Sequence, residues 1–409
     1  MPTHGRWEDG GVSVPVQSSV LFASPAASSG PEFVETPVAY DALVLASFGG
    51  PEGQDDVIPF LRNVTRGRGI PDERLEEVAH HYRHFGGVSP INQQNRELKA
   101  ALEAELATRG IDLPVYWGNR NWEPYLEDAF TAAANDGHKT LLVVATSAYS
   151  SYSSDRQYRE DIARAITEAG LQDRVTADKV RLFFDHPGFV APFQEGVDAA
   201  VQTFLEQGIA PADIHVLFST HSIPTADAER SGPRDVDWGE GGAYVAQHKA
   251  VAANIIENIA AVAGRAPVGG GTVPWQLVFQ SRSGPPSQPW LEPDINDVIA
   301  ELPAAGAKAI VIVPLGFVSD HMEVLWDLDT EAMESADEVG IPAVRTATPG
   351  IHPAFVSGLI DLVLERVDGT PAAQRPHLTA LGPWYDVARP GDCENVRLGF
   401  KPAAAGIAP

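Results

Sequence analysis

The sequence contains a single cysteine, Cys393, in 409 residues. One thiol cannot form an intramolecular disulfide, and chains without disulfides are typical of reducing compartments, so we expect this chain in the cytoplasm. One thiol also cannot supply the four cysteine ligands of an ordinary iron–sulfur cluster. The cysteine count therefore excludes a disulfide-stapled secreted domain and a four-cysteine cluster.

Long hydrophobic runs are also absent. The longest apolar stretches are shorter than the roughly 18 residues that a membrane-spanning helix needs. Residues 1–39 lack the basic start and the continuous apolar stretch of a signal peptide, and they mix Ser, Ala and Pro instead. We therefore expect a soluble chain with no membrane span and a disordered leader over residues 1–39.

Basic residues are scarce, because 29 Lys and Arg stand against 55 Asp and Glu, for a formal net charge of −26. Such a field repels nucleic acid and anionic membrane surfaces, so we do not expect either as a main partner. Arg66 and Arg68 are notable in so acidic a chain, since they can meet carboxylates on a ligand. Apolar residues make up 44% and charged residues 21%, a globular composition in a chain long enough for two domains.

Short apolar runs alternate with longer amphipathic segments along the chain. This alternation is typical of βα units, and it predicts an α/β fold with parallel sheets. Strands are expected over residues 42–48, 114–118, 140–145, 180–184, 215–219, 276–280, 309–313 and 343–346. Helices are expected over residues 98–109, 123–135, 161–168, 193–207, 243–263 and 295–302.

The strand–helix rhythm occurs twice. We therefore predict an N-terminal α/β lobe over residues 40–190 and a C-terminal α/β lobe over residues 191–367. A weakly ordered tail rich in Pro, Ala and Gly is expected over residues 368–409. In open parallel sheets ligands bind outside the carboxyl ends of the strands, so the segments that follow the strands are where a site is expected.

Several strand ends carry unusual residues, and each is open to two interpretations. "SFGGPEG" (residues 47–53) can be a plain turn or a place where the backbone approaches a ligand closely. "STHSIP" (residues 219–224) places His221 just beyond a buried strand, as a structural histidine or as a base or metal ligand. "FQSRSGPPSQPWLEPDI" (residues 279–295) is a stiff loop that can form a cleft wall or a surface connection.

Two further groups favour a structural explanation on the residues alone. His80, His81 and His84 can form a pair on one helical face, but they lack a third ligand for a metal. The tyrosines of "TSAYSSYSSDRQYRED" (residues 146–161) suit a flat ligand with charged edges, yet covering the core explains them more simply.

A row of carboxylates follows another buried strand, in "PLGFVSDHMEVLWDLDTE" (residues 314–331). Glu323, Asp327 and Glu331 are four residues apart and line one stripe of a helix. A solvated acidic face is the usual explanation for such a row. Because this row begins where a buried strand ends, the pattern instead favours a stripe that handles a cation, and imidazole with carboxylate suits Fe²⁺, Co²⁺ or Zn²⁺.

Six motifs follow one another along the chain: "SFGGPEG", "FGGVSPIN", "GNRNWEPY", "THSIP", "FQSRSGPPSQPWLEPD" and "GFVSDHMEVLWDLDTE". In this order and spacing they resemble the motifs of the ferrochelatases, and most closely those of the Gram-positive branch that uses coproporphyrin III. The resemblance covers about residues 40–364. It implies two Rossmann-like lobes, each with a parallel four-stranded sheet flanked by helices, and a porphyrin cleft between them.

The resemblance also implies roles for residues at the second lobe's strand ends. It places the catalytic pair on His221 and Glu323, which would both contact iron and handle protons. It continues the metal site, as a conduit for metal or protons, through Asp327 and Glu331. His321 would then have a structural or supporting role.

Porphyrin contacts follow from the same resemblance. It places a serine and a tyrosine contact on Ser89 and Tyr158, and the substrate's carboxylates would also meet Arg66. Trp290 belongs to the loops that would grip the ring. Some coproporphyrin enzymes have a tyrosine as an axial contact where this chain has Phe48, so the iron would lack a phenolate.

Some close relatives hold a [2Fe–2S] cluster on one internal and three C-terminal cysteines. This chain has Ser154 and Asp155 in the internal region and Cys393 alone in the tail. We therefore predict no such cluster, and no cofactor beyond the Fe²⁺ that is a substrate.

The activity implied is insertion of Fe²⁺ into coproporphyrin III to give coprohaem, with transient contacts to neighbouring haem-pathway enzymes. Three alternatives stay open: a protoporphyrin IX ferrochelatase, a cobalt chelatase of tetrapyrrole synthesis and a non-catalytic tetrapyrrole carrier. The preferred metal and porphyrin separate the enzymes from one another, and a carrier would bind porphyrin without metallating it.

Overall fold

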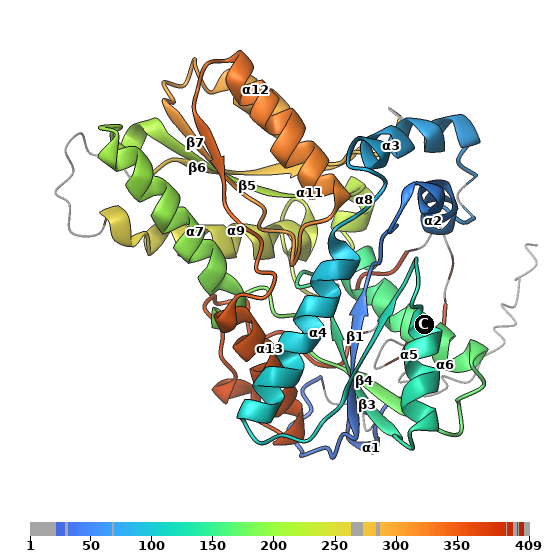
Figure 1. Cartoon of the computed structure of the whole chain (residues 1–409). Coiled ribbons are helices and arrows are strands. Elements are labelled where there is room, and N and C mark those ends of the chain that lie inside the picture. Colours follow the sequence, from blue (N-terminus) through green and yellow to red (C-terminus); the bar gives the residue numbers. More distant parts are fainter. Residues whose placement is uncertain are drawn as a thin grey trace, which may run out of the picture.

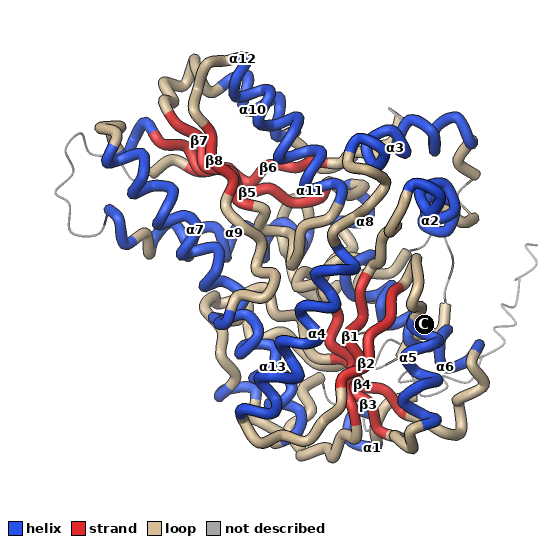
Figure 2. Tube along the Cα trace, viewed as in Figure 1, coloured by secondary structure: helices blue, strands red, loops and turns tan. Residues whose placement is uncertain are grey.

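Two four-stranded parallel sheets lie at the centres of two lobes (Figures 1 and 2). The computed structural model describes residues 22–28, 32–67, 69–262, 273–283, 287–389, 391–395, 399 and 401–404. The first sheet contains β1 (Ala42–Ser47), β2 (Val115–Asn119), β3 (Thr140–Ala145) and β4 (Thr176–Lys179), in the order β2-β1-β3-β4. The second contains β5 (Ile214–His221), β6 (Trp275–Gln280), β7 (Ala309–Val313) and β8 (Ala343–Arg345), in the order β6-β5-β7-β8. The predicted fold class is confirmed.

Helices cover both faces of each sheet (Figure 2). The first sheet packs against α4 (Ile91–Thr108), α5 (Leu126–Asn135) and α6 (Gln157–Glu168). The second packs against α7 (Pro187–Glu206), α9 (Gly242–Glu257), α10 (Ile295–Glu301), α11 (Met322–Trp326) and α12 (Met333–Glu338). The remaining α-helices are α1 (Pro25–Ser28), α2 (Val57–Val64), α3 (Asp72–His84), α8 (Thr225–Ala228) and α13 (Pro353–Val367).

One large apolar core joins the two lobes. It contains Leu45 of β1, Leu102 of α4, Phe193 of α7, Val216 of β5 and Leu359 of α13. Alternate residues of the strands face smaller cores on the other side of each sheet. The lobes therefore share a continuous interior.

The path of the chain crosses between the lobes more than once. The boundary expected after residue 190 falls inside α7. The last long helix, α13, follows the second sheet in sequence but lies beside α4 of the first lobe (Figure 1). Arg109, the residue after the end of α4, forms an ion pair with Asp361 of α13 at 2.6 Å, and this fixes the contact.

One predicted strand, residues 180–184, is wrong. The strand ends at Lys179, and Leu182, Phe183 and Phe184 are buried in the core without pairing. A paired strand and an unpaired segment buried in the core have the same apolar composition, so composition could not distinguish between them. The real strand, "TADK", has few apolar residues because its Asp178 and Lys179 are buried in ion pairs.

Both chain ends differ from the expected leader and tail wherever they are described. Ser24 binds the carboxylate of Asp178 through its backbone N–H at 2.9 Å and its hydroxyl at 2.6 Å. In the tail, Arg375 and Asp386 are buried together at 2.8 Å, and the Val34 N–H donates to that same aspartate. Buried ion pairs order segments whose Pro, Ala and Gly content indicated loose structure. Residues 1–21 and 405–409 lie outside the described residues.

None of the helices in the described residues is both long and apolar enough to span a membrane.

Candidate active site at the carboxyl end of the second sheet

His221 is the last residue of β5, and its neighbours fix its ring. Its backbone pairs with Gln280 at the end of β6, and the Ser222 N–H then donates to the Gln280 carbonyl at 2.7 Å. The Tyr244 hydroxyl, from α9, donates to the His221 carbonyl at 2.9 Å. The imidazole Nδ1–H donates to the Ser222 carbonyl, which leaves Nε2 directed away from the strand.

Glu323 meets His221 from α11. Its Oε1 lies 3.6 Å from His221 Nε2, and its side chain is 47% exposed. Burial alone would lower the pKa of His221, but the Glu323 carboxylate and the Ser222 carbonyl raise it to about 9. Burial alone would raise the pKa of Glu323, but His221 lowers it to about 2. Near neutral pH the two side chains therefore form an imidazolium–carboxylate pair.

His321 has a structural position at the start of α11. Its Nδ1 accepts the backbone N–H of Glu323 at 3.2 Å, which caps the helix. Burial lowers the pKa of His321, and a neutral ring is what an accepting Nδ1 requires. His321 thus orients Glu323 through the backbone.

The acidic row continues behind this pair. α11 changes at Asp327 into a π-helix, Asp327–Ala332, so the row does not follow the straight α-helical stripe that the sequence predicted. Asp327 Oδ2 accepts from the Ser281 hydroxyl and from Gln280 Nε2 at 3.3 Å. Burial, with the charges of Glu323 and Glu331, raises the pKa of Asp327 to about 7 despite the Ser281 hydroxyl. Its carboxyl can therefore exchange a proton near neutral pH.

The first lobe faces this row with α3. Tyr82 packs on Phe60, and burial together with the charges of Glu323 and Asp327 raises its pKa. Phe60 in turn contacts Phe48, a residue that is 37% exposed. The aromatic side chains of Tyr82, Phe60 and Phe48 in the first lobe thus lie opposite the carboxylates of the second lobe.

The three histidines of α3 surround Trp326. His81 stacks on the indole with ring centroids 4.1 Å apart, and His80 and His84 contact it edge-on. Within the described parts of the chain, no group of three or more His, Cys, Asp or Glu side chains is arranged to hold a metal ion. The three histidine rings pack around one indole, and this contact is what the structure shows of them.

The predicted porphyrin contacts are scattered over several environments. Ser89 is buried beside Gly50, and Tyr158 is buried under the Arg120 guanidinium, which lies 4.0 Å above its ring. Arg66 is exposed, and its side chain donates to Asn63 Oδ1 at 2.6 Å. Arg68 lies outside the described residues.

Trp290 lies in the loop that returns to the His221 segment. Pro224 and Trp290 form an antiparallel bridge, and Leu291 N–H donates to the Ile223 carbonyl at 3.0 Å. The Ser222 hydroxyl donates to the Leu291 carbonyl at 2.8 Å. The Gly/Pro-rich loop thus braces the segment that follows His221.

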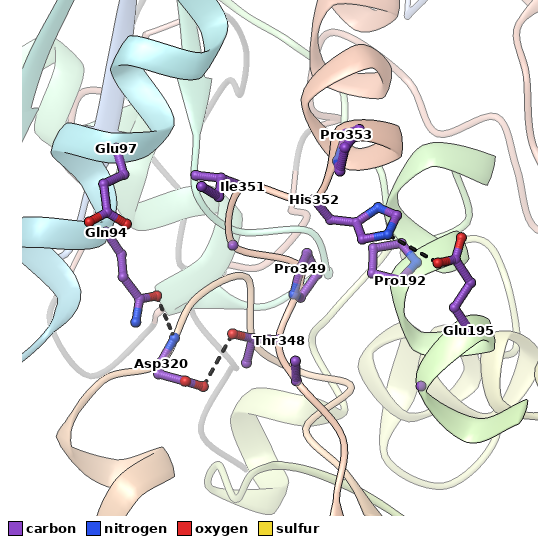
Figure 3. A pocket seen from close by; sticks show the side chains of 13 residues that line it. Gln94, Glu97, Pro192, Glu195, Asp320, Thr348, Pro349, Ile351, His352 and Pro353 are labelled. Carbon is purple, nitrogen blue, oxygen red and sulfur yellow. Dashed lines mark hydrogen bonds and ion pairs between the residues drawn. The ribbon is translucent and has the colours of Figure 1, made fainter. Parts of the chain in front are cut away.

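A pocket of about 650 Å³ lies on the other side of the Asp320 loop (Figure 3). Asp320 N–H donates to Gln94 Oε1 of α4 at 2.9 Å, and its carboxylate accepts from Thr348 at 3.1 Å. Neither His221 nor Glu323 lines this pocket. It marks a contact between the lobes behind the candidate site.

The regions that the resemblance linked to a [2Fe–2S] cluster do meet in space, but they do not fit one. Asp155 is buried in ion pairs with Arg159 at 3.0 Å and Lys179 at 3.1 Å. Cys393 lies 3.3 Å from the Ser150 hydroxyl, and it is the only thiol in the sequence. The region around Asp155 and Cys393 is therefore filled by ion pairs and hydrogen bonds.

The sequence analysis did not single out four residues that organise the site: Gln280, Ser281, Tyr82 and Tyr244. The first two lie inside a quoted motif, directly after a strand, and this position was the available signal. Ser281 also has a left-handed backbone, with φ of 62°. The roles of the two tyrosines depend on contacts between distant segments, for which the sequence gives no local sign.

Comparisons with known proteins show which family the chain belongs to. A family model described as "Ferrochelatase" matches residues 40–367. The chain is 69% identical over 398 residues to the coproporphyrin III ferrochelatase of Leifsonia xyli subsp. xyli, covering 95% of this chain and 100% of the relative. It is 55% identical over 396 residues to the coproporphyrin III ferrochelatase of Tropheryma whipplei (strain Twist), covering 96% and 98%. A solved sirohydrochlorin chelatase from Bacillus subtilis subspecies spizizenii matches at 14% identity and a TM-score of 0.44, covering 83% of this chain and 100% of that one. The resemblance seen in the sequence is confirmed, and the chain belongs to the ferrochelatase family.

Proposed function

We propose that this chain inserts Fe²⁺ into coproporphyrin III to give coprohaem in haem synthesis. The observation that carries the proposal is the pairing of His221 Nε2 with Glu323 Oε1 at 3.6 Å, at the carboxyl end of the second sheet. Family membership supports insertion of iron into a porphyrin, and the two relatives compared above both have the name coproporphyrin III ferrochelatase.

The reaction exchanges two pyrrole N–H protons for one Fe²⁺, which sheds water as it enters the ring. In this proposal His221 and Glu323 meet the metal and the departing protons on one face of the macrocycle. Before the metal arrives, the positive charge of the His221 imidazolium balances the negative charge of the Glu323 carboxylate. When His221 passes its proton to solvent by way of Asp327 and Glu331, Fe²⁺ would balance the Glu323 charge in its place, so the pair binds either a proton or the metal.

Asp327 and Glu331 would carry the released protons to solvent. Asp327 lies behind Glu323 with a pKa of about 7, and it interacts with Glu331 on its outer side. A carboxyl with such a pKa accepts a proton from the site and releases it near neutral pH. We favour protons over metal for this row, because the Asp327 carboxyl, with a pKa of about 7, can hold a proton near neutral pH.

Ser89, Tyr158, Phe48, Arg66 and Trp290 stay predictions as porphyrin contacts. Phe48 and Arg66 are exposed in the first lobe, where an apolar ring face and a ligand carboxylate could meet them. Ser89 and Tyr158 are buried, so a direct contact would require local rearrangement. Measured effects of each on the porphyrin Kd would test these assignments.

The test is anaerobic metal insertion with matched substrates. We expect kcat/KM with Fe²⁺ to be at least about 10-fold higher for coproporphyrin III than for protoporphyrin IX, a difference of about 1.4 kcal/mol. The reverse preference would assign the protoporphyrin reaction. Preferred insertion of Co²⁺ into sirohydrochlorin would assign a cobalt chelatase, and tight porphyrin binding without metallation would assign a carrier.

A single variant tests the assigned residue. His221→Ala should abolish Fe²⁺ insertion while the porphyrin Kd, from fluorescence titration, stays within about 2-fold. His215→Ala is the matched control, since His215 lies at the amino end of the same strand. Near-normal turnover of His221→Ala would contradict the proposal.

The proposal includes a cytoplasmic location, supported by a lone, buried and unbridged Cys393. Transient contacts with neighbouring haem-pathway enzymes would pass on the product. Fractionation of cells, and cross-linking in the presence of coprohaem, would test these two points.

A further inference from the structure

Gln280 connects the two halves of the candidate site. It is 1% exposed and is the last residue of β6, opposite His221 in the register. Its side-chain Oε1 accepts from the Ser219 hydroxyl at 2.7 Å, so β5 holds it. Its Nε2 donates to the Glu323 carbonyl at 3.0 Å and to Asp327 Oδ2 at 3.3 Å, so it holds α11 in turn.

The chemistry of its neighbours determines how the amide is oriented. Glu323 contributes a backbone carbonyl, which can only accept a hydrogen bond. The amide nitrogen must therefore face α11, because a flipped amide would place its oxygen against that carbonyl and the Asp327 carboxyl. The Ser219 hydroxyl can then donate to Oε1, so every atom of the amide has a suitable partner.

We propose that Gln280 is a positioning residue for metal insertion, which sets the separation between His221 on β5 and Glu323 on α11. This rests on the function proposed above. α11 is only five residues long and continues into a π-helix, so its own backbone bonds do not fix its distance from β5. The Gln280 amide spans that gap at the turn that bears Glu323.

Other contacts hold the helix elsewhere, so loss of Gln280 should not release it. Asp320, just before α11, is held by Gln94 and Thr348. Arg345 of β8 donates to the Asp329 carboxylate on the other side of the π-helix, with one contact at 2.9 Å. Removal of the amide should therefore shift Glu323 locally, and a shift of about 1 Å can cost about 100-fold in rate.

The test variant is Gln280→Met, which keeps the chain length and removes the amide. We expect kcat for Fe²⁺ insertion into coproporphyrin III to fall about 10- to 100-fold, with the porphyrin Kd within about 2-fold. Gln247→Met is the matched control, because Gln247 is equally buried and accepts from the Ser150 N–H at 2.8 Å without touching α11. Its kcat should stay within about 2-fold of the wild-type value.

Ser219→Ala gives a second, milder test that does not depend on how well Gln280→Met folds. It leaves the amide in place but removes its anchor on β5, so a loss of about 3-fold in kcat alone is expected. The proposal is overturned if both variants keep wild-type kcat, if Gln247→Met loses as much as Gln280→Met, or if the loss lies in the porphyrin Kd.

Wild type and His221→Ala are measured in the same series. If wild type inserts iron and His221→Ala does not, the proposed function stands and the Gln280 variants are judged alone. If wild type inserts no metal, the proposed function fails and the positioning role fails with it.

Discussion

The two sheets have the same strand order but end differently. In the first sheet, residues 42–46 of β1 pair with residues 141–145 of β3, and in the second, residues 214–218 of β5 pair with residues 309–313 of β7. Aligning these five pairs makes Gly49 equivalent to His221. β1 has left its sheet before that point, whereas β5 stays paired with β6 up to His221 and Gln280.

Because the two strands end differently, the equivalent positions Gly49 and His221 have different functions. Gly49 has φ of 82°, and a Cβ there would lie 2.8 Å from the Cβ of Asn119, so the first lobe uses this position for a close turn without a side chain. In the second lobe the added strand length carries an imidazole toward Glu323. One topology thus provides a tight turn in one lobe and a reactive group in the other.

The first prediction substitutes each of the two equivalent residues in turn. His221→Gly should lower kcat for Fe²⁺ insertion at least about 1000-fold, or about 4 kcal/mol, while the melting temperature changes little. Gly49→Ala should leave kcat nearly unchanged but lower the free energy of unfolding by about 2 kcal/mol, because alanine is strained in the left-handed backbone and its Cβ is crowded. Insertion assays and denaturant titrations of both variants check this. If the two variants lose similar amounts of kcat and of unfolding free energy, the two positions do not differ in function as stated.

Much of this arrangement could be predicted from the sequence, because buried parallel strands appear as apolar runs. β3 and β7 lie where they were expected. The polar residues at two strand ends made His221 and Glu323 candidates, and the family resemblance, not the pattern, named them as a pair. The errors arose where local pattern carries no information. β4 is a polar strand stabilised by ion pairs with distant segments, and the π-helix depends on i→i+5 bonding that residue spacing does not reveal.

The second prediction concerns the helix that returns to the first lobe. Arg366 of α13 is buried between Asp178 of β4 at 2.8 Å and Asp386 at 3.5 Å. Arg366→Met leaves the Asp178 carboxylate buried without a cation, while Asp386 keeps Arg375 at 2.8 Å, so the free energy of unfolding should fall by about 3 kcal/mol. Arg109→Met, which breaks the more exposed α4–α13 pair, should cost about 1 kcal/mol or less. Equal losses in denaturant titrations would mean that Arg366 does not hold α13 to the first sheet.

The third prediction uses a stack between the lobes. His248 of α9 stacks on Tyr149 of the first lobe with centroids 3.5 Å apart, and burial lowers its pKa from 6.5 to about 3, against the opposing effect of the Tyr244 carbonyl. The unfolded histidine binds a proton below pH 6.5 and the folded one does not, so stability is lost as pH falls from about 6.5 to about 3.

At pH 5 this loss should reach about 2 kcal/mol for the His248 site. His248→Phe keeps a ring in the stack and removes the titration. Wild type should therefore lose about 2 kcal/mol more than the variant between pH 7 and pH 5, by denaturant titration at each pH. Other buried histidines such as His186 contribute equally to wild type and variant, so their effect cancels in the difference. If the two plots of unfolding free energy against pH are parallel, His248 does not contribute this pH dependence.

The last prediction returns to the end of β6, where the second lobe places a serine in a backbone conformation that the first lobe gives to Gly49. Ser281 has φ of 62° and donates its hydroxyl to Asp327. Ser281→Ala and Ser281→Gly both remove the hydroxyl, so they should lower kcat equally. They differ in the backbone, because alanine keeps the left-handed strain of about 1–2 kcal/mol and glycine relieves it. The greater entropy of glycine in the unfolded chain offsets about 0.5–1 kcal/mol of this gain, so Ser281→Gly should be the more stable variant by up to about 1.5 kcal/mol. If the alanine variant is more stable, the left-handed strain is absent in solution, and the strand end at Ser281 is as relaxed as an ordinary turn.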